Sequence, residues 1–169
     1  LKKMTDSIAY RGPDADGFYT NEEQKVYFGH RRLSIVDLSG GAQPMSDHSG
    51  NFVITFNGEI YNHQIIRDEL EKKGYKFNTD HSDTETLLEA YKCWGKDMLP
   101  KLNGMFVFAI HDKQKKEVFI ARDRFGQKPL FYSNQYDTLV FSSELKAVVQ
   151  HDFVSNEKSP IAIKKYFAY

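Results

Sequence analysis

The segment Ile54–Gln64, ITFNGEIYNHQ, decides how the rest of the chain is interpreted. An apolar run reaches Asn57-Gly58, a dipeptide that normally reverses the chain between two strands. The residues that follow do not alternate as a returning strand would, and they are typical of a helix with Asn62 as its N-cap. We therefore expect a half-buried strand over 52–56, an end to that strand at Asn57-Gly58-Glu59, and a helix after it.

Length, charge and cysteine content narrow the class of protein. The 169 residues suit one domain with a real core, and 23 Lys and Arg balance 23 Asp and Glu. Zero net charge argues against a nucleic-acid or anionic-membrane partner met by bulk electrostatics. A single cysteine, Cys93, excludes an internal disulfide and fits a reducing compartment. Because no apolar run approaches membrane-spanning length, we expect a soluble, cytoplasmic domain.

Local patterns outside the opening segment predict helices and antiparallel hairpins. Ser82 with Glu85 three residues later forms a capping box, and Gly95 is a suitable stop for that helix. The succession predicts an α+β domain in which sheets are buried against helices. Helices are expected over 1–10, 61–77, 81–95, 144–150 and from Ser159-Pro160, strands over 18–21, 25–38, 105–112, 116–123, 130–134 and 138–143, and a long loop over 39–51.

Asn57 and Gly58 have two interpretations. The first is a tight turn, as the dipeptide alone suggests. The second uses both residues as donors, because a side-chain amide and an adjacent backbone N–H can converge on one oxygen. Such a pair stabilises the oxyanion of an acyl-transfer reaction.

Charged residues near these strand ends indicate which further chemical groups a bound ligand would carry. Arg32 suits either a surface ion pair or the bidentate capture of a carboxylate. Asp83 suits either complementing the helix dipole or, together with Glu59, accepting an ammonium group. A carboxylate site, an amine site and an amide-polarising pair together describe an α-amino acid with a side-chain carbonyl.

Other reactive residue types give weaker signals. Cys93 is expected in mid-helix without an adjacent histidine, which favours packing over nucleophilic catalysis. The six histidines show no metal-ligand spacing, so we predict no metal.

Seven motifs in order carry a resemblance to a known family: RGPDADG, HRRLSIVDLSGGAQPM, FNGEIYN, HSDTE, LNGMFVFAIHD, ARDRFGQKPLFY and FSSELKAV. Over residues 4–149 the chain resembles the glutamine-hydrolysing domain of glutamine-dependent asparagine synthetases, a class II glutamine amidotransferase domain. The resemblance implies a four-layer αββα N-terminal-nucleophile hydrolase fold, with two antiparallel sheets between helices and the N-terminal strand missing. Residues 1–150 would form the amidotransferase type 2 domain, and 151–169 would begin a linker or helix toward an absent synthetase domain.

The resemblance also implies roles for individual residues. Arg32 matches the arginine that holds the α-carboxylate of L-glutamine, and Asn57 and Gly58 match the oxyanion donors. Glu59 and Asp83 match the groups that receive the substrate α-amine. The pocket lining is matched by Leu33, Ser34, Ile35 and Val36.

The chain departs from the family at the nucleophile. In the family this is a cysteine at the mature N-terminus whose own α-amine is the base, whereas this sequence begins with Leu1. We expect the 169 residues alone to be inactive. The complete protein would release ammonia from glutamine to amidate aspartate, with ATP and Mg in the absent synthetase domain and no cofactor in this one. An exposed sheet edge would favour association, for example as a homodimer.

Two alternatives stay open. A class II amidotransferase domain can serve another acceptor, because acceptor residues would lie downstream of Tyr169. A non-catalytic scaffold homologue could instead lack the nucleophile and keep the fold for packing. The sequence on both sides of this segment would separate these hypotheses.

Overall fold

The computed structural model describes residues 1–33 and 41–168. They form a mixed α/β fold in which all strand pairings between named strands are antiparallel, as predicted. The helices are α1 (Lys2–Ser7), α2 (His63–Lys72), α3 (Asp83–Trp94), α4 (Leu145–Val148) and α5 (Pro160–Tyr166), with 3-10 turns η1 (Ala9–Arg11) and η2 (Gly95–Lys101). The strands are β1 (Ala15–Asn21), β2 (Val26–Arg32), β3 (Met45–Ser46), β4 (Phe52–Ile60), β5 (Gly104–Asp112), β6 (Glu117–Arg122), β7 (Phe131–Gln135) and β8 (Thr138–Ser142).

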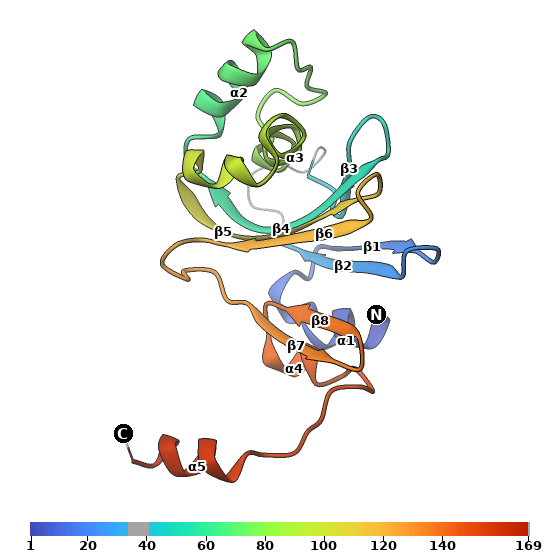
Figure 1. Ribbon diagram of the computed structural model, residues 1–169, viewed down its shortest axis with the longest axis vertical. Helices are drawn as coiled ribbons and strands as arrows, with labels where there is room; N and C mark the ends of the chain where they lie inside the picture. The colour runs from blue at the N-terminus through green and yellow to red at the C-terminus, as the bar shows by residue number, and fades with distance from the viewer. Residues whose placement is uncertain (34–40, 169) are drawn as a thin grey trace.

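Two of the three sheets lie between two groups of helices (Figure 1). Helices α2 and α3 cover one face of a four-stranded sheet with the order β3-β4-β5-β6. The β1–β2 hairpin lies on the other face, and α1, α4 and the β7–β8 hairpin lie beyond it. Helix α5 projects away from these layers. In the described residues no helix is long and apolar enough to cross a membrane.

Local signals set the helix boundaries. The Ser82 hydroxyl accepts a hydrogen bond from the Glu85 N–H at 3.2 Å, and α3 ends at Gly95 with φ +57°. Helix α2 begins after Asn62 as predicted, but the Asn62 side chain does not cap it. Its amide instead donates to the Lys101 carbonyl and accepts from the Asn103 N–H, both at 2.9 Å. Asn62 therefore joins the start of α2 to the chain after η2.

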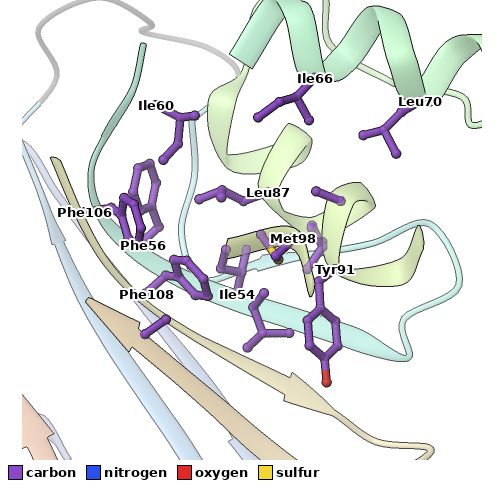
Figure 2. Packing of buried hydrophobic residues seen from close by; sticks show 14 residues of the cluster. Ile54, Phe56, Ile60, Ile66, Leu70, Leu87, Tyr91, Met98, Phe106 and Phe108 are labelled. Atoms are coloured by element: carbon purple, nitrogen blue, oxygen red, sulfur yellow. The ribbon is translucent and has the colours of Figure 1, made fainter. Parts of the chain in front are cut away.

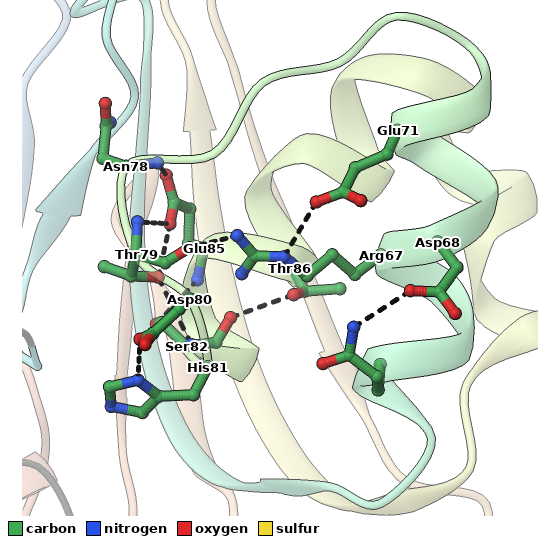
Figure 3. A network of polar contacts seen from close by, with 11 residues as sticks. Arg67, Asp68, Glu71, Asn78, Thr79, Asp80, His81, Ser82, Glu85 and Thr86 are labelled. Carbon is green, nitrogen blue, oxygen red and sulfur yellow. Dashed lines mark hydrogen bonds and ion pairs between the residues drawn. The ribbon is translucent and has the colours of Figure 1, made fainter.

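Glu85 completes only half of the expected capping box. Its carboxylate accepts hydrogen bonds from the Asn78 N–H at 2.7 Å and from the Thr79 N–H and hydroxyl at 2.9 and 2.6 Å (Figure 3). Arg67 of α2 donates to the Thr79 carbonyl and lies over the Phe77 ring. These contacts fix the loop that leads into α3, and with it the position of Asp83.

The main core lies between the four-stranded sheet and the two helices (Figure 2). Along β4 the predicted alternation is confirmed, because Ile54 and Phe56 are buried in this core and Phe52 packs against it. The rings of Tyr91 and Phe119 stack with centroids 5.5 Å apart. Buried members from the facing elements are Ile60, Ile66, Leu70, Leu87, Leu88, Met98, Phe106, Phe108 and Ile110.

The expected end of the strand at Asn57-Gly58-Glu59 is wrong. Strand β4 runs through these residues to Ile60, and Gly58 pairs with Phe106 of β5. A Cβ atom at Gly58 would lie 2.2 Å from the Met105 carbonyl oxygen and 2.7 Å from the Phe106 Cα. Glycine is therefore required here because two strands approach closely, and not because the chain turns. The proposed oxyanion donors lie within a strand rather than at its tip.

A smaller cluster lies on the opposite face of the sheet. Phe28 of β2, Val53 of β4 and Ala109 of β5 are buried there. His111 is fully buried beside them: its Nδ1 lies 2.9 Å from the Tyr19 hydroxyl and its Nε2 lies 2.7 Å from the Gln24 side-chain oxygen. This histidine therefore links the four-stranded sheet to the β1–β2 hairpin.

Two predicted segments fall partly outside the described residues. The strand expected over 25–38 is observed as β2 up to Arg32, and its remainder falls on 34–40. The loop expected over 39–51 contains the short strand β3. The hairpins β5–β6 and β7–β8 are confirmed, and Tyr136 and Asp137 turn the second with φ +52° and +55°.

Candidate functional site

The structure contains a cavity of about 670 Å³. Residues of β2, β4, β5, the start of α3 and the segment after β8 line it. Its volume falls in the range of small-molecule sites, roughly 300–1,000 Å³. All predicted site residues within 1–33 and 41–168 line it, whereas Ser34, Ile35 and Val36 lie outside the described residues. The lining predicted residues are Arg32, Leu33, Asn57, Gly58, Glu59 and Asp83.

Arg32 reaches the cavity from the end of β2. Its backbone carbonyl accepts a hydrogen bond from the Asp14 N–H at 3.1 Å, which fixes the strand end. Its guanidinium lies against Gly41, where an added Cβ would be 2.6 Å from Nη2. Leu33, the next residue, is 53% exposed and so lies at the mouth of the site.

Asn57 and Glu59 reach the cavity because β4 continues through them. Side chains alternate along a strand, so these two residues face away from the core that holds Phe56 and Ile60. The site is therefore built on the reverse side of a rigid, buried strand. This position needs no turn at Asn57-Gly58.

Asp83 joins α3 to β4. One carboxylate oxygen accepts a hydrogen bond from the Ile60 N–H at 3.1 Å. Burial raises the pKa of Asp83, and the negative charge of Glu59 adds to this, although the Ile60 N–H, His63 and the Thr84 N–H oppose it. A cationic ligand group between Glu59 and Asp83 would relieve the cost of holding two acids in one hollow.

His30 is a cavity residue that the sequence reasoning missed. Its Nδ1 lies 3.3 Å from the Thr55 hydroxyl of β4. Burial, followed by the positive charge of Arg32, lowers the pKa of His30 to about 4. The imidazole is therefore neutral at neutral pH. The available signal was strand periodicity, since His30 lies two residues after the buried Phe28 and shares its face.

Ser143 is a second residue that the sequence reasoning missed. It follows β8 and lines the cavity, where its hydroxyl accepts a hydrogen bond from the Asn57 side-chain amide at 3.1 Å. The two residues are 86 positions apart in sequence. No local pattern indicates this contact.

The segment after β6 brings one more charge to the cavity. Although burial raises the pKa of Asp123, hydrogen bonds from the N–H groups of Gln127, Lys128, Phe106 and Phe125 lower it below its ordinary value. These bonds, at 2.8 to 3.2 Å, hold the loop in which Lys128 lines the cavity.

Cys93 lies apart from this site. It is half-buried in α3 and packs against the main core, and it is absent from the residues that line the cavity. Its predicted packing role is confirmed. Within the described ranges there is no group of three or more His, Cys, Asp or Glu residues that could hold a metal ion.

Together the cavity offers a guanidinium, two carboxylates and a side-chain amide from three parts of the fold. Arg32 comes from β2, Asn57 and Glu59 from β4, and Asp83 from α3. This set can bind a small zwitterion and donate to a third polar group.

Comparisons with known proteins agree with the family resemblance and with the observed fold. A family model described as a glutamine amidotransferase domain matches residues 1–169. Asparagine synthetase [glutamine-hydrolyzing] 1 of Bacillus subtilis is 44% identical over 171 residues, covering 100% of this chain and 26% of the relative. Asparagine synthetase B of Escherichia coli is 41% identical over 143 residues, covering 84% of this chain and 25% of the relative. The amidase chry2 of Gibberella zeae is 36% identical over 148 residues, covering 87% of this chain and 22% of the relative.

A solved structure supports the same conclusion. The glutamine phosphoribosylpyrophosphate amidotransferase of B. subtilis superimposes with a TM-score of 0.57 at 28% identity, covering 70% of this chain and 28% of that one. The chain thus spans about a quarter of the length of the relatives it matches. From residue 1 to residue 169, the chain belongs to the glutamine amidotransferase domain family.

Proposed function

We propose that the cavity binds L-glutamine and that the complete protein hydrolyses it to glutamate and ammonia. One observation carries this proposal: Arg32, Asn57, Glu59 and Asp83, from three separate elements, line a single cavity of suitable size. The names of the relatives, which include glutamine-hydrolysing enzymes, support the same substrate.

The ends of the substrate have matching groups in the cavity. Arg32 takes the α-carboxylate, because a guanidinium can donate two parallel hydrogen bonds to it. Glu59 and Asp83 take the α-ammonium, which offsets the burial that raises the pKa of Asp83. Bound in this way, the side-chain amide of glutamine extends toward Asn57.

The chemical step is an acyl transfer. Attack on the side-chain carbonyl of glutamine forms a tetrahedral oxyanion, ammonia leaves, and water then releases glutamate. Asn57 and the Gly58 N–H stabilise the oxyanion, and loss of one such donor typically lowers turnover roughly 100- to 1,000-fold.

The nucleophile comes from outside these 169 residues. Cys93, the single cysteine of the sequence, packs in the main core and is not among the cavity-lining residues. The family resemblance implies a cysteine at the mature N-terminus, with its α-amine as the base. On this proposal the 169 residues alone do not hydrolyse glutamine.

The acceptor of the ammonia is a further part of the proposal. The asparagine synthetase relatives support aspartate, amidated on an ATP- and Mg-dependent synthetase domain that residues 151–169 connect to this one. Relatives with other names, among them an amidase and a phosphoribosylpyrophosphate amidotransferase, keep a different acceptor as the second candidate.

Glutamate release by the full-length protein tests the function. Arg32→Ala should raise KM about 10- to 100-fold, since a hydrogen bond to a charged group contributes about 1.5–3 kcal/mol. Asn57→Ala should lower kcat by two to three orders of magnitude and leave KM nearly unchanged. Arg124→Ala, an exposed arginine outside the cavity, is the matched control.

The contrary outcomes are equally definite. Turnover that is indifferent to Arg32→Ala would remove this arginine from the site. Glutamine binding without any turnover by the full-length protein would favour a non-catalytic scaffold homologue.

A further inference from the structure

We propose that Ser143 is a positioning residue that holds the Asn57 amide ready for the transition state. The inference rests on the proposed glutamine hydrolysis and extends it to a residue outside the predicted site. Its observation is the hydrogen bond of 3.1 Å from Asn57 Nδ2 to Ser143 Oγ. Both residues line the cavity, Asn57 from β4 and Ser143 from the segment after β8.

Asn57 has a fixed backbone and a side chain that can rotate. Its backbone is held in β4, opposite Val107 of β5. The terminal torsion of asparagine is broad, so backbone pairing alone does not set the plane of the amide. A hydrogen bond from Nδ2 sets that plane. One of the two Nδ2 protons goes to Ser143, and the second is left for an oxygen in the cavity.

Ser143 suits this role because its own backbone is anchored on both sides. It directly follows β8, which pairs with β7. The next residue, Glu144, is held by an ion pair of 2.6 Å with Arg11. Helix α4 then begins and buries Ala147 and Val148. The hydroxyl therefore sits on a short, fixed connection between a strand and a helix.

The physical consequence is preorganisation of the oxyanion donor. A donor that already points at the site of charge development needs no reorientation when the oxyanion forms. Without Ser143, the amide would sample other torsions, and part of its stabilisation would be lost. Glutamine binding would change little, because Arg32, Glu59 and Asp83 hold the other end of the substrate.

Steady-state glutamine hydrolysis by the full-length protein gives the first test. Ser143→Ala should lower kcat about 3- to 10-fold, the worth of one neutral hydrogen bond, with KM within about twofold. Ser143→Thr keeps the acceptor and should restore most of the rate. Ser133→Ala, half-buried in β7 and outside the cavity, should have no effect.

The double variant separates positioning from a general structural role. If Ser143 acts only through Asn57, the pair Asn57→Ala with Ser143→Ala should be no slower than Asn57→Ala alone. Multiplicative losses, or an unchanged kcat in Ser143→Ala, would overturn the proposal. A KM effect that exceeds the kcat effect would overturn it as well.

The Asn57 side-chain amide resonance gives a readout that does not depend on turnover. In labelled full-length protein, one Nδ2 proton should resonate downfield in the wild type and in Ser143→Thr, and should lose this shift in Ser143→Ala. Absence of the shift in the wild type would overturn the proposal. If the shift is present but the wild type does not hydrolyse glutamine, the proposed function fails and the positioning contact stands.

Discussion

The two faces of strand β4 lie in contrasting surroundings. On the helix side, Ile54, Phe56 and Ile60 belong to a large core closed by α2 and α3. On the other side, Val53 belongs to a cluster of three buried residues, and beyond it the same face opens into the cavity. One strand therefore supplies packing to one half of the molecule and polar groups to the other.

The contrast indicates where the free energy of folding is concentrated. Apolar burial contributes roughly 25 cal/mol per Å² removed from water, so the helix-covered half provides most of the stabilisation. The half with the cavity holds the half-buried His30, Arg32 and Asn57, whose placement costs free energy. A strand fixed by the first half can hold such groups rigidly in the second.

The largest expected effect compares two buried phenylalanines. Phe108 in the main core is 1% exposed, and Phe28 beside the cavity is 2% exposed. Phe108→Ala should lower the free energy of unfolding by about 3–5 kcal/mol, the usual cost of such a truncation. Phe28→Ala should cost less, because neighbours beside an open cavity can relax into the space. Urea denaturation measures both, and equal losses would contradict the difference between the halves.

A second effect uses pH to probe the half with the cavity. Because burial lowers the pKa of His30 to about 4 from an ordinary 6.5, the unfolded chain binds a proton that the folded chain does not. The neutral His30 therefore favours the folded state fully above pH 6.5, and this stabilisation is lost as the pH falls toward 4. The free energy of unfolding should fall by about 3 kcal/mol over this range because of His30. His30→Gln should flatten the stability profile over this range, whereas the exposed His48→Gln should not. A profile unchanged in His30→Gln would place the acid sensitivity elsewhere.

The smallest expected effect on stability belongs to Asp83. Its pKa is raised by burial, so its contribution to stability is greatest below its ordinary pKa and is lost as the pH rises through the folded value. Asp83→Asn removes the charge and keeps an acceptor for the Ile60 N–H. At pH 7 the unfolding free energy should therefore change by no more than about 0.5 kcal/mol.

The same variant should have a large effect on the proposed binding. The KM for glutamine should rise about 10- to 100-fold, because a charge-assisted hydrogen bond is lost. Asp97→Asn, exposed in η2, should change neither quantity. A strongly destabilised Asp83→Asn with normal KM would make Asp83 a structural residue.

Much of the fold could be predicted because its signals are local. Ser82 and Gly95 mark the ends of α3, and the polar link at Tyr136 and Asp137 marks the β7–β8 turn. The end of β4 could not be predicted in this way. Asn57-Gly58 carries a turn signal, and what overrides it is the close contact of Gly58 with β5, nearly 50 residues later.

The candidate site shows the same division. Arg32, Asn57, Glu59 and Asp83 could be named from their chemistry, and the structure brings them to one cavity, although their roles stay predictions. Ser143 could not be named, because its contact with β4 is made only in the folded chain. For His30, strand periodicity indicated the buried face of β2, but the contact with Thr55 of β4 could not be predicted. Side-chain type indicates what a residue can bind, whereas long-range pairing decides which residues meet.

The antiparallel register of β4 and β5 has a consequence for how this domain can diverge. Side chains alternate along a strand with a period of two. A one-residue deletion or insertion that shifts the register of β4 would turn Asn57 and Glu59 toward the main core and Phe56 toward the cavity. A gain or loss of residues should therefore be tolerated in hairpin tips such as 113–116 and excluded from 52–60 in functional descendants.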